Sequence, residues 1–157
     1  MQDLATEIGV SRATLFRWVG GRDELLTEVL WSLAEPTLRD AVATASGKGG
    51  AKLAGALESF TATLLATDYF ATFLQREPER ALRVLTTRAG SLQGRMTTAM
   101  QELLEEHLDA ATLPMDPPDM AYLLVRVVET FLYTDMITGE RADPAKVGQA
   151  IAALLRD

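Results

Sequence analysis

The sequence predicts an all-α fold, on three observations. Apolar residues recur every three or four positions, as one face of a helix requires. No stretch alternates apolar and polar residues in the way of a half-buried strand, and no hairpin dipeptide separates such stretches. Only residues 46–50 (Ser-Gly-Lys-Gly-Gly) and 114–118 clearly interrupt the helical pattern.

The helices are expected, in order, at residues 2–8, 12–19, 23–45, 51–67, 69–76, 78–88, 91–112, 118–138 and 144–156. Polar and special residues support several of their ends. Ser11 can accept a hydrogen bond from the free amides of the second helix, and Asp23 places negative charge on the first turn of the third. Gly139 fits a left-handed C-terminal cap, and Asp143-Pro144 is typical of an N-cap followed by proline in the first turn.

Composition limits the function. The chain has 157 residues, the size of one ordinary domain, with 22 acidic and 15 basic residues and a net charge of −7. Any DNA contact must therefore come from a local arrangement of basic side chains. There is no cysteine and one histidine, His107, which excludes zinc–thiolate sites and disfavours a histidine-based catalytic relay. We expect no enzyme activity, no cofactor and no metal.

The sequence also carries no sign of a membrane partner. It opens without a signal segment, and no uncharged apolar run reaches the ~18 residues that a membrane-spanning helix needs. We expect a soluble, cytoplasmic protein.

The first 26 residues have the spacing of a helix-turn-helix. Leu4 and Ile8 form the apolar face of a short helix, Gly9 can adopt the positive φ of a tight turn, Ser11 caps the next helix, and Leu15 points back at the first. This pattern presents a second helix to a groove of DNA. The alternative is a surface corner of two helices without a ligand.

These residues resemble a known family. The segment GVSRATLFRWVGGRDELL is similar to the DNA-binding signature of TetR/AcrR-type transcriptional regulators. Further along, AEPTLRDA, REPERALRVLTTRAGSLQ and VETFLYTDMITGE resemble the regulatory domain of the branch that represses degradation genes for the quorum signals called acyl-homoserine lactones. The resemblance covers essentially the whole chain.

The resemblance implies which residues contact DNA. By this resemblance, Ser11, Arg12 and Ala13 reach base edges at the start of the recognition helix, and Thr14, Arg17 and Arg22 contact phosphates. Guanidinium groups suit both guanine edges and phosphates, and a hydroxyl suits a phosphate oxygen. Phe16 stands where the family usually has tyrosine, and Trp18 where many members have histidine. The implied DNA-binding residues are Ser11, Arg12, Ala13, Thr14, Phe16, Arg17 and Arg22.

The resemblance also implies a division of the chain at residue 45. Residues 1–45 would form the helix-turn-helix region with its connecting helix, and residues 46–157 a ligand-binding and dimerisation domain. The family places a further helix before the motif, because a helix-turn-helix needs a third helix to cover its apolar back. Since Met1 coincides with the start of the second family helix, we expect the first helix to be missing from this sequence.

A polar stripe runs along the otherwise apolar helix 118–138. At about 100° per residue, Tyr122, Arg126, Glu129 and Tyr133 lie within an arc of about 60°. Two interpretations stay open. The stripe is an internal ion pair with tyrosine hydroxyls that stabilises a core or dimer interface, or it is the polar end of a ligand pocket.

The remaining ligand-binding candidates are apolar. They would form the wall of the pocket, although apolar stripes at helical spacing are equally typical of plain core packing. With the polar candidates Arg126, Glu129 and Tyr133, the expected ligand-binding residues are Phe60, Leu64, Tyr69, Phe73, Met96 and Met100.

The resulting hypothesis is a homodimeric repressor that a small, mostly apolar effector releases from a double-stranded DNA operator. The dimer would form through helices 118–138 and 144–156, whose apolar surface is too large for one domain to cover. The branch resemblance suggests a lactone-like effector. The alternative is a ligand-binding helical dimer that lacks DNA binding because the first helix is absent.

Overall fold

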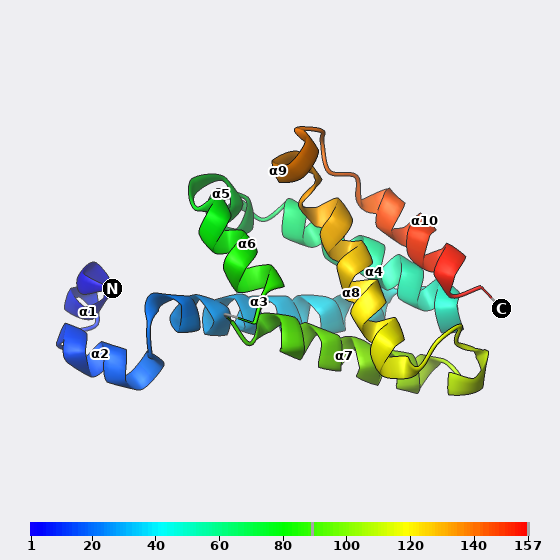
Figure 1. Ribbon diagram of the computed structural model, residues 1–157, viewed down its shortest axis with the longest axis horizontal. Coiled ribbons are helices and arrows are strands. Elements are labelled where there is room, and N and C mark those ends of the chain that lie inside the picture. The colour runs from blue at the N-terminus through cyan, green and yellow to red at the C-terminus, as the bar shows by residue number, and fades with distance from the viewer. Residues whose placement is uncertain (89, 157) are drawn as a thin grey trace.

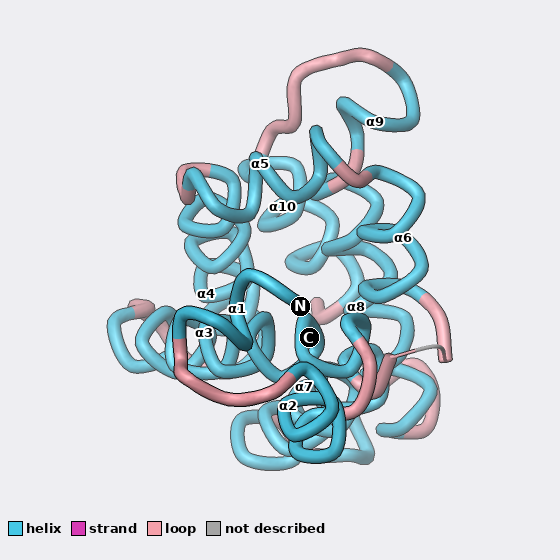
Figure 2. The backbone as a smooth tube through the Cα atoms, turned by 90° about the vertical axis from the view of Figure 1, so that its left-hand side faces the viewer, coloured by secondary structure: helices cyan, strands magenta, loops and turns pink. Residues whose placement is uncertain are grey.

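A computed structural model describes residues 1–88 and 90–156, and this part of the chain consists of helices joined by loops, without a strand (Figures 1 and 2). The all-α prediction is therefore confirmed. The elements are α1 (Gln2–Glu7), α2 (Arg12–Val19), α3 (Arg22–Thr44), α4 (Gly49–Leu65), α5 (Asp68–Arg76), α6 (Pro78–Thr86), α7 (Leu92–His107), the 3-10 helix η1 (Ala110–Thr112), α8 (Pro117–Leu132), α9 (Thr134–Thr138) and α10 (Pro144–Leu154).

The predicted helix ends agree best with the structure where the sequence contains a capping residue. The Ser11 hydroxyl accepts from the Thr14 amide at 3.0 Å, and the Asp143 carboxylate accepts from the Ala145 amide at 3.1 Å. Gly139 closes α9 in the left-handed region with φ +75°. Gly9 takes φ +74° in the turn between α1 and α2.

Two expected helices are shorter than the periodicity predicts. The segment 91–112 leaves the helix after His107, because Leu108 is extended and η1 follows. The segment 118–138 breaks at Tyr133 into α8 and α9. There the Thr134 hydroxyl donates to the carbonyls of Thr130 and Phe131, a side-chain bond that competes with the helical amide ladder.

The helices form a bundle with one projecting end. In Figure 1, α1 and α2 lie apart from the other helices and connect to them through α3, which runs along the bundle. Within the bundle, α10 packs against α4 and α8 packs against α7. The centre of the core is fully buried and includes Leu53, Leu57, Leu104, Leu124 and Ile151.

The long helix α3 links the projecting end to the core. Its 23 residues include Pro36, which has no amide to donate to the preceding turn. Leu30 and Leu38 bury the inner face of α3 against the bundle. None of the described helices combines the length and the apolar character that crossing a membrane requires.

Candidate functional site

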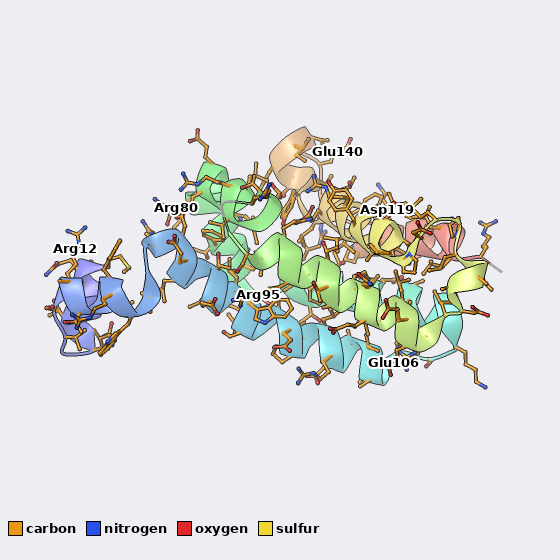
Figure 3. All side chains as sticks on the ribbon, turned by 60° about the horizontal axis from the view of Figure 1, so that its bottom comes forward. Arg12, Arg80, Arg95, Glu106, Asp119 and Glu140 are labelled. Atoms are coloured by element: carbon orange, nitrogen blue, oxygen red, sulfur yellow. The ribbon has the colours of Figure 1, made fainter. Side chains whose placement is uncertain are left out.

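The projecting end presents the outer face of α2. Leu15 is buried and, with Ala5 of α1, holds the two short helices together. Arg12 and Arg17 are exposed on α2, and neither forms an ion pair with any residue that the structure describes. Figure 3 shows Arg12 pointing away from the rest of the molecule. These two guanidinium groups are free to meet an anionic partner.

The other candidate DNA-binding residues divide into two groups. Ser11, Ala13 and Phe16 are exposed, Phe16 to 59%. Thr14 is half-buried, and its hydroxyl lies 2.8 Å from the Ser11 hydroxyl. Arg22 is partly exposed but already engaged, as described below.

The first turn of α3 carries an ion-pair cluster that joins it to α5 and α6. The Arg22 guanidinium lies 2.5 Å from the Glu77 carboxylate, between α5 and α6. Asp23 pairs with Arg80 at 3.1 Å and with Arg83 at 2.5 Å, both on α6. Arg80 also pairs with Glu77, which closes the cluster. We call these five residues the α3–α6 cluster.

A cavity lies inside the bundle, between α3, α4, α5, α6, α7 and α8. Its water-accessible volume is about 60 Å³, which is several times what one water needs. The wall is apolar except for Tyr69, Glu129 and Tyr133. The residues that line it are Leu30, Ala34, Leu57, Phe60, Leu64, Tyr69, Phe70, Leu85, Leu92, Met96, Met100, Val125, Val128, Glu129, Leu132 and Tyr133.

Most of the expected ligand-binding residues meet at this cavity. Those that line it are Phe60, Leu64, Tyr69, Met96, Met100, Glu129 and Tyr133. Phe73 and Arg126 do not. Phe73 is partly buried against the core, and the Arg126 side chain is 42% exposed on the outer side of α8.

The sequence-based prediction missed the lining residues of α3 and α6, the apolar ones of α8, and also Leu57, Phe70 and Leu92. The sequence pattern is typical of ordinary core positions at Leu30, Ala34 and Leu85. Periodicity shows which face of a helix is buried, but it does not show whether a buried side chain packs against a neighbour or borders a cavity. The polar stripe is also shorter than its spacing suggests, since Tyr122 is 52% exposed and far more accessible than Glu129 or Tyr133.

Among the described residues of the cavity wall, Glu129 is the only charged group, and it is 8% exposed. Arg126 Nη1 lies 2.6 Å from Glu129 Oε2. With its amide nitrogen turned toward α8, Gln93 donates to Glu129 Oε1 at 2.7 Å and to the Leu85 carbonyl at 3.1 Å. Burial raises the pKa of Glu129 to about 7, and the nearby Arg126 partly opposes this rise.

Tyr133 lies at the junction of α8 and α9 and is 4% exposed. Burial, and then the charge of Glu129, raise the pKa of the Tyr133 hydroxyl, so this group keeps its proton. Across residues 1–88 and 90–156, no group of three histidine or acidic side chains is arranged to hold a metal ion. The chemistry that the cavity offers is hydrogen bonding and apolar contact.

Comparison with known proteins agrees with this arrangement. Residues 48–156 match the family described as Tetracyclin repressor-like, C-terminal domain. The R. erythropolis transcriptional repressor QsdR from the TetR family is similar in structure, with a TM-score of 0.86 and 32% sequence identity over 97% of this chain and 81% of that chain. A search of curated proteins found no match. Because the family match spans more than half of the sequence and the similar structure covers nearly all of it, the chain belongs to the TetR family of transcriptional regulators.

Proposed function

We propose that the protein is a transcriptional repressor that a small, mostly apolar effector releases from its DNA operator. The observation that supports this proposal is that α3 both follows the exposed helix α2 and forms part of the cavity wall. This helix begins three residues after the exposed helix α2 ends, and its residues Leu30 and Ala34 form part of the cavity wall. A molecule that enters the cavity therefore touches the helix that positions α2.

DNA contact is assigned to α2 and the residues that flank it: Ser11, Arg12, Ala13, Thr14, Phe16, Arg17 and Arg22. The unpaired, exposed Arg12 and Arg17 support this assignment, since guanidinium groups bind both phosphates and guanine edges. The effector would lie in the cavity, and the resemblance to regulators of quorum-signal degradation suggests a lactone-like molecule. Residues 1–45 and 46–157 are the proposed functional divisions.

The repressor is proposed to act as a homodimer through α8 and α10. Tyr122, Leu123, Val127 and Phe131 leave apolar surface on the outer side of α8. Two copies would present their α2 helices to half-sites about one helical turn of DNA, roughly 34–36 Å, apart.

Selection from a library of random DNA duplexes with the full chain tests the proposal. We expect a two-fold symmetric consensus, bound at least about a thousandfold more tightly than an unrelated duplex at physiological salt. A series of lactones with increasing acyl length should then release the bound duplex in fluorescence anisotropy. Failure to enrich any sequence would contradict the proposed DNA binding.

A further inference from the structure

The polar groups of the cavity are few and different in kind. Of the sixteen described side chains that line it, Tyr69, Glu129 and Tyr133 carry polar oxygen atoms, and Tyr69 is 42% exposed at the outer edge. The enclosed part of the wall therefore offers one carboxylate and one phenol. Any ligand held there is oriented by these two groups, because apolar contacts have no direction.

The Glu129 carboxylate is held from outside the cavity. Arg126 approaches Oε2 and Gln93 donates to Oε1, and neither of these residues lines the cavity. Each carboxylate oxygen can accept two hydrogen bonds. Glu129 is thus fixed in position and keeps acceptor capacity for a donor inside the cavity.

The Tyr133 hydroxyl lies on the same wall and is influenced by the charge of Glu129. Within the described residues, no group forms a hydrogen bond with this hydroxyl, although the side chain is buried. Unlike Glu129 Oε2, the hydroxyl oxygen is not fully enclosed by protein, so it can donate a hydrogen bond to a ligand in the adjoining space. The Tyr133 hydroxyl is therefore free to donate a hydrogen bond to an acceptor atom of a ligand.

We propose that the cavity selects an apolar molecule with a neutral amide head, whose N–H donates to Glu129 and whose carbonyl accepts from Tyr133. This inference rests on the proposed function, since it names the chemical class of the effector. It also differs from the expectation that Arg126 binds a carbonyl or carboxylate head, because Arg126 lies outside the cavity. A carboxylate head would meet the buried charge of Glu129 with the same sign and bind weakly.

Three probes of equal chain length test the proposal: N-methyldecanamide, N,N-dimethyldecanamide and decanoate. The first has an N–H and a carbonyl, the second only the carbonyl, and the third a negative charge. Calorimetric titration of the full chain at pH 8 should give N-methyldecanamide an affinity about tenfold or more above that of N,N-dimethyldecanamide, with decanoate the weakest. Equal affinities for the three probes, or no binding of the first, would overturn the proposal.

Two variants separate the roles of the side chains, once cooperative melting has confirmed that they fold. Tyr133→Phe should weaken both amides by about tenfold and leave their ratio unchanged, because both carry the carbonyl. Glu129→Gln should raise the affinity for decanoate relative to the amides, since the repelling charge is gone. Thr130→Val removes a hydroxyl from the exposed side of the same helix and should change none of the affinities.

The outcomes also distinguish this inference from the proposed function. If N-methyldecanamide binds preferentially but leaves the selected DNA duplex bound, the head-group preference holds and the release mechanism is wrong. If lactones without an N–H release the duplex while N-methyldecanamide does not bind, the repressor function holds and the amide head is wrong.

Discussion

Arg22 and Glu77 are 55 positions apart in the sequence, and their side chains form an ion pair of 2.5 Å. Arg22 follows the exposed helix α2, and Glu77 joins α5 to α6, which line the cavity through Tyr69, Phe70 and Leu85. The pair thus connects the proposed DNA-binding end to helices around the proposed effector site. Because Arg22 is also a proposed phosphate ligand, DNA and Glu77 would compete for the same guanidinium.

Glu77→Gln should weaken this connection with little loss of stability. The two side chains are 50% and 31% exposed, so solvent screens their attraction, and the free energy of unfolding should fall by no more than about 1 kcal/mol. The loss should shrink in 1 M NaCl. Urea unfolding at two salt concentrations measures both effects. Glu79→Gln, two positions along in the first turn of α6 and outside the cluster, is the matched control, and equal losses in the two variants would contradict the prediction.

Arg12→Ala and Arg17→Ala should each weaken binding to the selected DNA duplex by about tenfold or more, without changing the melting temperature, because both side chains are exposed and unpaired among the described residues. If a variant loses a phosphate contact, the dependence of log K on log salt should also become shallower by about one. Anisotropy titrations at several salt concentrations provide the measurement. Arg141→Ala, an exposed arginine in the loop before α10, should bind DNA like the wild type.

Stability should fall as pH rises from 4.5 to about 7. The pKa of Glu129 is about 7 in the folded protein against an ordinary value of 4.5, so in this range the folded state binds more protons than the unfolded state. The charge of Glu129 therefore opposes folding at neutral pH, by at most about 3 kcal/mol. Urea unfolding from pH 4.5 to 8 should show this decline in the wild type but not in Glu129→Gln. A decline of the same size in the variant would show that another group is responsible.

Gly50→Ala should destabilise the contact between α4 and α10, whereas Gly55→Ala should stabilise the protein. A Cβ on Gly50 would lie 2.7 Å from Leu155 Cβ and also meet the Leu155 carbonyl, which is backbone and cannot rotate away. Crowding of this kind costs about 1–3 kcal/mol. A Cβ on Gly55 meets nothing within 4 Å, and alanine should gain about 0.5–1 kcal/mol in the interior of α4. Thermal unfolding of both variants tests the opposite signs.

Tyr122→Glu should convert the proposed dimer into a monomer. Tyr122 is 52% exposed on α8 beside other apolar side chains, and a carboxylate there would be buried without a partner in the dimer. Sedimentation at micromolar concentration should give twice the chain mass for the wild type and the single mass for the variant. Val29→Glu introduces the same charge at an exposed site of α3 and should remain dimeric. A monomeric wild type would refute the proposed interface.

The sequence predicts the helices of this protein well because the signals that define a helix lie close together along the chain. Periodicity and caps such as Ser11 and Asp143 depend on neighbours a few positions away, and the structure confirms these ends. In the α3–α6 cluster, the ion pairs that α3 forms join positions 55 to 60 apart, and no spacing rule indicates such pairs. Likewise, the spacing of α8 places Arg126 and Glu129 on one stripe, yet the packing of α7 and α8 decides that only Glu129 reaches the cavity.

The length of α3 has a mechanical consequence. At about 1.5 Å per residue its 23 residues span about 34 Å, and the two that line the cavity, Leu30 and Ala34, lie on either side of its midpoint. The helix can therefore act as a lever. If it pivots near its far end, each degree of tilt moves the α2 end by roughly 0.6 Å, by the geometry of a rigid rod of that length. A tilt of only a few degrees at the cavity would thus shift the side chains of α2 by more than the tolerance of a hydrogen bond to a base.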